Sequence, residues 1–305
     1  MAPPPPADAS LGERLAKVAT TLQFAWFCGH FTLLLSVIRY SLSYLTFNYY
    51  SRWAQVTYRL AFISAVATYG IVVFKAYRAR VKPGAKIGST VYLLLSDENV
   101  QYLRELVLGD KLINHESNVI CTVISLVWLF ARQVPLALLP FTVYSVFHVA
   151  TYTRTVIIPT FQPPKAAPSS TPTSPSASKA SQSPLANSIG RFVKEYYDGS
   201  MMLVALLEIL LWFRLFLSAL TFSKGSWILL SIYAVFLRAR YSQSQFVQGA
   251  FLQMGARIDQ QVQNPNVPPA LRQAWETVKG LLRQTVEATN VHKYMGGQTP
   301  QKKPQ

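Results

Sequence analysis

Cysteine and negative charge are scarce in this 305-residue chain. The two cysteines, Cys28 and Cys121, both lie inside apolar stretches, where a thiol acts as a small hydrophobic group. This usage does not predict a disulfide framework. The 13 acidic residues are outnumbered by 29 lysines and arginines, and charged residues make up only 14% of the chain. Together with 50% hydrophobic residues, this composition departs from soluble averages in the direction of membrane proteins.

Signatures of catalysis are also missing. The sequence has no HExxH, GxSxG, CxxC, GxGxxG or G-x4-GK[ST] motif. Residues 84–90 resemble a phosphate-binding loop but lack the Gly-Lys pair that holds the phosphates. Asp97 and Glu98, which follow Ser96, are more typical of a helix N-terminus than of a metal site. We therefore expect no enzyme activity, no catalytic residues, no cofactor and no metal.

Long apolar runs are what the chain does contain. The first has no formal charge over residues 18–38, and at about 1.5 Å per helical residue it can cross a hydrocarbon core of about 30 Å. The pattern predicts an all-α, multi-pass transmembrane helical protein, with about six membrane segments arranged as helical hairpins. The other five runs, free or nearly free of charge, occupy residues 60–74, 117–131, 133–153, 201–221 and 226–237.

Basic residues predict the orientation of these segments. Three hairpins with both termini in the cytoplasm place 23 of the 29 lysines and arginines on the cytoplasmic side, as the positive-inside rule expects. The number of full spans is less well defined, because the runs at 60–74 and 226–237 are short. Short hairpins that enter and leave on the cytoplasmic side would wedge one leaflet and curve the membrane. The six remaining cations are Arg39, Arg52, Arg59, Arg132, Arg214 and Lys224.

Proline-rich and polar stretches divide the chain into segments. A tract rich in Pro, Ser, Thr and Ala is too poor in bulky apolar groups to pack, so it predicts a linker between two membrane modules. The expected segments are a disordered Pro-rich N-terminus (1–17), a membrane module (18–160) with a cytoplasmic loop (75–116), a disordered Pro/Ser linker (161–188), a second membrane hairpin (189–240), amphipathic helices (241–295) and a basic tail (296–305).

The C-terminal segment is amphipathic. Apolar residues recur at helical spacing before and after a proline-containing break at 264–269, and basic residues flank the second stripe. Such helices bind anionic lipid at the membrane surface, although packing on the protein's own cytoplasmic loops is an equally open alternative. The predicted membrane-inserting residues are Phe251, Met254, Ile258, Trp275, Leu281 and Leu282, and the predicted phospholipid contacts are Arg272, Lys279 and Arg283.

Five ionisable residues fall inside the predicted spans: His30, Arg59, His148, Glu208 and Arg214. A charge at the bilayer centre costs about 2.5–3.5 kcal/mol on insertion scales, so these residues are candidates for function. One interpretation is that they line the path of a channel or transporter. The favoured interpretation for His30 and His148 is a neutral pair hydrogen-bonded between helices. Glu208 and Arg214 are six residues apart and are not neighbours on a helix, so each needs its own partner or a place near an interface.

Several distinctive motifs occur in order along the chain: FAWF with GH at 24–30, YRL at 58–60, TYGIVV at 68–73, DENVQY at 97–102, and LLPF with YSVFHVATY at 138–152. Through these motifs the chain resembles the fungal pore-membrane-protein and animal transmembrane-protein "thirty-three" family, over roughly 15–160 and more loosely over 187–290. This resemblance implies a multi-pass protein of the endoplasmic reticulum and nuclear envelope, associated in fungi with nuclear pore complexes and more widely with reticulon-type tubule-shaping proteins.

We therefore expect a non-enzymatic membrane scaffold of the endoplasmic reticulum and nuclear envelope, including the nuclear pore membrane. Its role would be nuclear pore complex assembly or distribution and the shaping of curved membrane. The expected partners are the lipid bilayer, anionic phospholipids, nucleoporins, reticulon-type proteins and a nuclear transport receptor. Nucleic acid is not expected, because the basic residues form no base-reading motif. The alternatives are a channel or transporter and, less favoured, an intramembrane enzyme.

Overall fold

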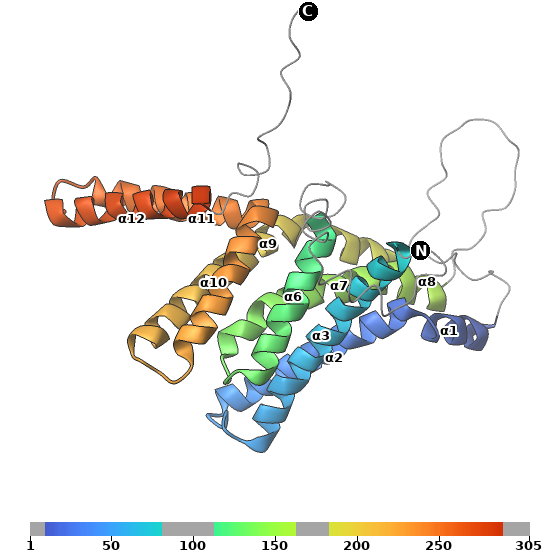
Figure 1. Cartoon of the computed structure of the whole chain (residues 1–305). Coiled ribbons are helices and arrows are strands. Elements are labelled where there is room, and N and C mark those ends of the chain that lie inside the picture. Colours follow the sequence, from blue (N-terminus) through green and yellow to red (C-terminus); the bar gives the residue numbers. More distant parts are fainter. Residues whose placement is uncertain (1–9, 81–112, 163–182, 289–305) are drawn as a thin grey trace, which may run out of the picture. The chain divides into compact units, whose positions relative to one another are not determined.

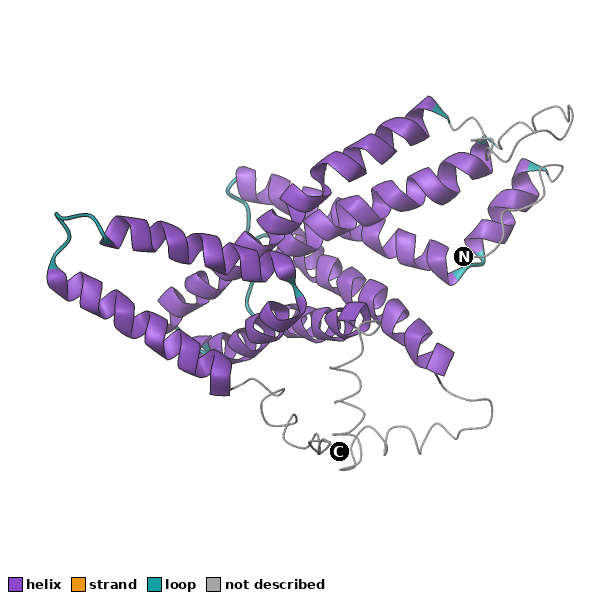
Figure 2. Cartoon of the chain, turned by 90° about the horizontal axis from the view of Figure 1, so that it is seen from above, coloured by secondary structure: helices purple, strands orange, loops and turns teal. Residues whose placement is uncertain are grey.

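The computed structural model describes residues 10–80, 113–162 and 183–288 (Figure 1). Within these ranges all regular secondary structure is helical, as Figure 2 shows, which confirms the predicted fold class. The chain divides into two compact units, Met1–Gln248 and Gly249–Gln305. The phosphate-loop-like stretch at 84–90, the helix start expected at Ser96 and the basic tail at 296–305 lie outside the described residues.

The first unit consists of three helical hairpins and short flanking helices. Helix α2 packs against α3 and α7, α3 against α6, α7 against α9, and α6 against α10, so the hairpin α6/α7 lies between the other two. The turns of all three hairpins lie at one end of the unit (Figure 1). The helices are α1 (Leu11–Ala19), α2 (Leu22–Leu45), α3 (Arg52–Arg80), α6 (Ile113–Phe130), the 3-10 turn η1 (Pro135–Ala137), α7 (Leu138–Tyr152), the π-helical turn η2 (Thr153–Ile157), α8 (Ile158–Phe161), α9 (Pro184–Leu220) and α10 (Ser226–Gln243).

The second unit contains most of α11 (Gln245–Val262) and all of α12 (Pro269–Ala288) among its described residues. A turn at 263–268 joins the two helices, where the sequence predicts a break. Pro268 and Pro269 mark the start of α12, because a proline at the first helical position lacks only an N–H that would have no partner there.

Four helical segments are long and apolar enough to cross a membrane: Leu22–Leu45, Arg52–Ala76, Pro135–Phe161 and Pro184–Leu220. Helix α6 adds a shorter apolar segment, Asn118–Phe130. Each of the six predicted apolar runs lies mostly in a hairpin helix, but only four hairpin members meet the requirement for a full crossing. A helix of 18 residues, such as α6 or α10, is about 27 Å long and falls just short of a 30 Å core.

Two expected segment boundaries differ from the structure. Helix α1 lies partly inside the stretch 1–17 that was expected to be disordered, because Ser10 and Glu13 form a capping box: the Ser10 N–H donates to Glu13 Oε2 at 3.0 Å, and the Glu13 N–H donates to Ser10 Oγ. Helix α9 begins at Pro184, inside the expected linker 161–188, and continues without interruption into the membrane segment. A proline at the start of a helix is favourable, so the linker ends earlier than its composition suggests.

Small polar side chains let the helices approach closely. Ser36, Thr57 and Ser125 are buried, yet each donates to the backbone carbonyl four residues before it, at 2.7, 2.8 and 2.6 Å, so its hydroxyl is satisfied within its own helix. At Gly29 a Cβ atom would lie 2.5 Å from Thr68 Cγ2, which shows how tightly α2 and α3 meet. The close approach at Gly29 packs α2 against α3 in the first hairpin, and the three buried hydroxyls are not left unpaired.

Candidate functional site

The C-terminal hairpin is joined by the carboxylate of Asp259 on α11. This group accepts hydrogen bonds from Trp275 Nε1 at 2.7 Å and from Lys279 Nζ at 2.9 Å, both on α12. At the turn, Arg272 donates to the carbonyl of Asn264 at 2.9 Å. The hydrogen bonds from Lys279 and Trp275 hold the pKa of Asp259 below its usual value. Two amphipathic helices are thus fixed to each other through polar groups.

The predicted membrane-binding residues of this hairpin differ in their exposure. Leu281 and Leu282 are exposed by 58% and 53%, and Leu271 and Val278 on the same face of α12 are also exposed. Helical spacing places these four side chains on one apolar surface. We call Leu271, Val278, Leu281 and Leu282 the outer face of α12.

The other predicted inserting residues are less accessible. Phe251, Met254 and Ile258 on α11 are half-buried, and so is Trp275 on α12. Among the predicted phospholipid contacts, Arg272 and Arg283 are exposed, whereas Lys279 forms ion pairs with Asp259 and with Glu276 at 2.8 Å. Asp259 thus joins the two helices to each other, while the outer face of α12 is exposed; lipid binding by that face stays a prediction.

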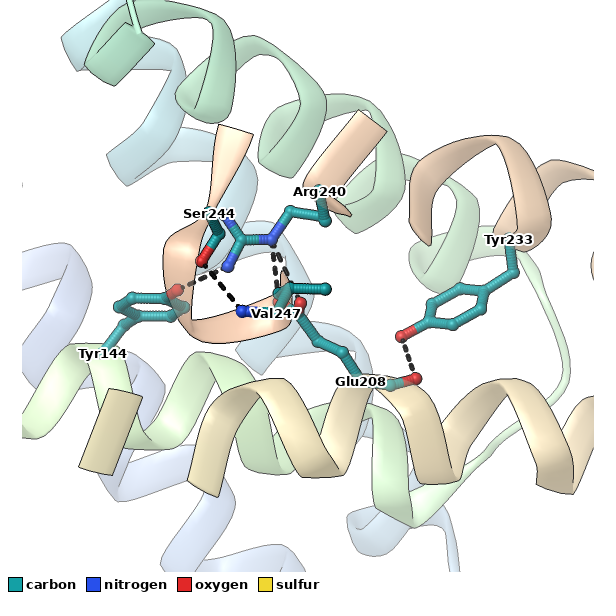
Figure 3. A network of polar contacts seen from close by, with 6 residues as sticks. All are labelled: Tyr144, Glu208, Tyr233, Arg240, Ser244 and Val247. Atoms are coloured by element: carbon teal, nitrogen blue, oxygen red, sulfur yellow. Dashed lines mark hydrogen bonds and ion pairs between the residues drawn. The ribbon is translucent and has the colours of Figure 1, made fainter. Parts of the chain in front are cut away.

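A buried polar cluster joins three helices of the first unit (Figure 3). Glu208 on α9 and Arg240 on α10 form an ion pair in which Arg240 Nε lies 3.1 Å from both carboxylate oxygens. Arg240 Nη2 donates to the hydroxyl of Tyr144 on α7 at 2.9 Å, and the Tyr233 hydroxyl donates to the backbone carbonyl of Glu208 at 3.1 Å. Both charged side chains are buried. Glu208 thus obtains its partner from the next helix.

The partner of Glu208 was not predicted from the sequence. Arg240 follows the last apolar run and was counted among the 23 cations expected on the cytoplasmic side; in the structure it lies within α10 and is 5% exposed. The lone carboxylate in an apolar stretch was a signal that a buried cation must exist, since an unpaired charge is costly in a low-dielectric interior. Spacing along the chain did not identify which cation this is.

The two intramembrane histidines lie together. The ring centroids of His30 on α2 and His148 on α7 are 4.6 Å apart, and Trp26 packs edge-on against both rings. His30 Nδ1 lies 3.0 Å from the hydroxyl of Ser145. The two rings therefore meet between α2 and α7, where the hydrogen bond of His30 is made to Ser145; that both rings are neutral stays a prediction.

Arg59 and Arg214 occupy different surroundings. Arg59 is half-buried and donates from Nη1 to the backbone carbonyl of Trp128 at 3.1 Å and to that of Leu129, so it satisfies carbonyls at the C-terminal end of α6. Arg214 is exposed on α9. The five intramembrane residues therefore lie in four separate places: His30 contacts His148, Glu208 pairs with Arg240, Arg59 caps α6, and Arg214 is exposed. The described contacts do not join them into a continuous polar path.

The cavity beside the buried polar cluster is very small. It is lined by residues of α3, α6, α7, α9 and α10, including Tyr144, Glu208 and Tyr233, and has a volume of about 10 Å³. This is room for about one water molecule. In the part of the chain that the structure describes, no group of three or more His, Cys, Asp and Glu side chains is arranged to hold a metal ion.

Comparison with known proteins gives a consistent result. The family model described as Transmembrane protein 33/Nucleoporin POM33 matches residues 110–287. The chain is 50% identical over 305 residues to the nucleoporin POM33 of Chaetomium thermophilum, covering 99% of each chain. The chain belongs to the Transmembrane protein 33/Nucleoporin POM33 family. This confirms the resemblance found in the sequence.

Two further fungal relatives match most of the chain. The pore membrane protein of 33 kDa of Saccharomyces cerevisiae is 30% identical over 285 residues, which are 90% of this chain and 87% of the relative. Tetra-spanning protein 1 of Schizosaccharomyces pombe is 29% identical over 270 residues, which are 88% of this chain and 86% of the relative. No solved structure matches.

The family match covers the described polar cluster and the C-terminal hairpin. Residues 110–287 include Tyr144, Glu208 and Arg240, and extend through the outer face of α12. The extent differs from the sequence-based expectation, which put the stronger resemblance at 15–160. Both candidate sites therefore lie in the part of this family member that the family model describes.

Proposed function

We propose that this protein is a non-enzymatic membrane scaffold of the nuclear pore membrane and the endoplasmic reticulum, which contributes to nuclear pore complex assembly or distribution and to shaping curved membrane. The observation that carries the proposal is an exposed apolar face on a helix beyond the membrane segments, in a chain 50% identical to a nucleoporin. Its proposed partners are anionic phospholipids, nucleoporins, reticulon-type proteins and a nuclear transport receptor.

The C-terminal hairpin supports a role on curved membrane. Inserting the outer face of α12 to the depth of the headgroup boundary would bury leucine side chains that now face water. Arg272 and Arg283 are exposed on the same helix, where they can contact anionic phosphates. Helices of this kind bind best where lipids are loosely packed, as they are on the curved surface of a pore membrane.

The three hairpins of the first unit, which we together call the membrane module from here on, support a structural role over transport or catalysis. The cavity beside Glu208 and Tyr144 has room for about one water molecule, so it does not accommodate a substrate. The buried ion pair, the hydrogen bond between His30 and Ser145, and the Arg59 cap each join polar groups of different packed helices. These contacts hold the helices of the first unit together.

Live-cell imaging tests the proposal. A tagged chain is compared with a chain lacking residues 242–305, beside one marker of nuclear pores and one of tubular reticulum. We expect punctate signal at the nuclear rim that becomes diffuse on truncation, because the truncated chain loses the outer face of α12. Uniform reticular signal that truncation leaves unaltered would contradict the pore assignment and favour a general reticulum role or a transporter.

A further inference from the structure

The first and last hairpins of the membrane module share a sequence motif. Residues 38–48 on α2 align without a gap with residues 213–223 on α9. The alignment continues into the helices after the two turns, α3 and α10, since the buried residues Tyr58 and Tyr233 fall at equivalent positions. The identical pairs in the aligned segment are Arg39/Arg214, Leu42/Leu217, Ser43/Ser218, Leu45/Leu220, Thr46/Thr221 and Phe47/Phe222.

Both copies of the motif end the helix in the same way. The N–H of Phe47 donates to the carbonyl of Tyr44 and that of Asn48 to the carbonyl of Ser43; the second copy repeats this with Phe222 to Ala219 and Ser223 to Ser218. These are the two hydrogen bonds of a Schellman motif, in which glycine usually takes the left-handed position. Here a phenylalanine takes it, with φ of 56° at Phe47 and 50° at Phe222. A bulky residue in this region is strained.

This backbone conformation holds each aromatic ring outside the protein. Phe47 is 87% exposed and Phe222 is 82% exposed, so neither contributes to the packed core. Phe130, at the turn of the middle hairpin, is 82% exposed as well. All three turns lie at one end of the unit (Figure 1). If these two positions served only to turn the chain, glycine would occupy them without strain. The exposed phenylalanines therefore indicate a binding partner outside the chain.

The turns are also tied to one another. On the middle hairpin, Arg132 Nη2 donates to the hydroxyls of Ser218 and Ser226, the latter at 3.2 Å. The Val134 N–H donates to the hydroxyl of Tyr58 at 3.1 Å. The three exposed rings are therefore held on one rigid end of the module.

The charges at this end have one sign. No aspartate or glutamate occurs between Glu13 and Asp97, or between Glu208 and Asp259. Arg39 and Arg214 are exposed on the same two helices, and Arg39 Nη1 reaches toward the turn to donate to Ser43 Oγ at 2.6 Å. Exposed aromatic rings at the turns, with exposed arginines about two helical turns before them and without carboxylates, match the boundary between acyl chains and phosphates, which a long arginine side chain can reach.

Helix length places the turns at such a boundary. Helix α2 has 24 residues and is about 36 Å long, slightly more than the hydrocarbon core of about 30 Å. We propose that Phe47 and Phe222, presented by their left-handed turns, form a second lipid-binding site that anchors the module in the headgroup boundary of the leaflet in which the three turns lie, with Arg39 and Arg214 contacting phosphates. This anchor is independent of the nuclear pore role.

Spin labels next to the two rings test the anchor in the full chain. Asn48→Cys and Ser223→Cys are each introduced with Cys28→Ala and Cys121→Ala, labelled with a nitroxide, and reconstituted in phosphatidylcholine vesicles containing phosphatidylserine. We expect both labels to be shielded from a water-soluble nickel quencher on either side of the membrane and accessible to oxygen. Phe47→Gly with Phe222→Gly should abolish this shielding, and Phe47→Trp with Phe222→Trp should keep it.

Thermal unfolding in detergent separates anchoring from folding. Because glycine adopts the left-handed conformation without strain, the double glycine variant should unfold at the same temperature as the parent or higher. A lower unfolding temperature would overturn the proposal. So would labels that are open to nickel in the parent chain, which would indicate a protein partner for the rings, or shielding that appears only at high protein-to-lipid ratio, which would indicate a second copy of the chain.

Discussion

Arg240 on α10 places its Nε 3.1 Å from both carboxylate oxygens of Glu208 on α9, inside the membrane module. Tyr144 on α7 accepts a second hydrogen bond from the same guanidinium at 2.9 Å. The pair thus connects the last hairpin internally and joins it to the middle one. Separating these helices would leave a charge unpaired in the interior, which is costly, so the ion pair favours this arrangement of the three helices.

Removing one charge of this pair should destabilise the module strongly. Glu208→Ala leaves Arg240 buried without a counter-charge, and we expect a loss of about 3–5 kcal/mol in the free energy of unfolding. Denaturation in detergent measures this. Replacing both residues by apolar ones of similar volume, Glu208→Leu with Arg240→Met, should recover most of the loss. Arg214→Gln, at an exposed site, serves as the control and should change stability little; equal losses from both single variants would contradict the prediction.

A side chain at Gly29 should separate α2 from α3. The new Cβ of Gly29→Ala would lie 2.5 Å from Thr68 Cγ2, so the Thr68 side chain or one of the two helices must shift, at a cost of about 1–3 kcal/mol. Gly70→Ala in α3 is the matched control, because no atom lies within 4 Å of its new Cβ. We expect a lower unfolding temperature for the first variant and an unchanged or slightly higher one for the second. Equal unfolding temperatures for the two variants would show that α2 and α3 are not in close contact.

The contribution of Asp259 to the C-terminal hairpin should depend on pH. Its pKa is held below the usual value of about 3.8, first by the hydrogen bond from Lys279 and then by that from Trp275. A depressed pKa in the folded state means that the stabilisation is present above the unfolded-state pKa and is lost as pH falls through the folded-state value. Carboxyl NMR titration of the full chain in micelles should therefore show Asp259 titrating below its usual range.

Lys279→Met tests what lowers the pKa of Asp259. Because this variant removes the hydrogen bond from Lys279, the pKa of Asp259 should rise toward its ordinary value. Arg283→Met is the control, because Arg283 acts on Asp259 only as a weaker, more distant charge and should produce a smaller rise. If the two variants titrate alike, the hydrogen bond from Lys279 is not what lowers the pKa.

Charges on the outer face of α12 should detach the C-terminal hairpin from anionic membrane. Leu281→Asp with Leu282→Asp places two carboxylates where insertion requires apolar groups, and we expect punctate rim signal in cells to become diffuse. The matched control is Gln273→Asp with Gln284→Asp, which adds the same charge on the opposite, polar face of the helix. Retained rim signal in the leucine variant, or its loss in both variants, would argue against insertion through this face.

The sequence by itself determined the membrane character of the chain, its helices and its family. Charge-free runs of sufficient length predict helices in a bilayer because no other open structure satisfies its backbone there. The family motifs and the two amphipathic stripes could likewise be recognised from the sequence, because each depends on residues that are near one another in the chain. The shared segments at 38–48 and 213–223 could also have been found by comparing the sequence with itself, but only the structure shows that both contain a phenylalanine in the left-handed conformation.

Tertiary structure decided which polar groups meet. Glu208 pairs with Arg240 and not with Arg214, His30 lies against His148, and Lys279 contacts Asp259 as well as solvent. Each choice depends on the rotation and axial position of one helix against another, which is set by many small packing contacts across elements. Helical periodicity fixes the face on which a side chain lies, but the helix that covers this face is known only once the chain has folded.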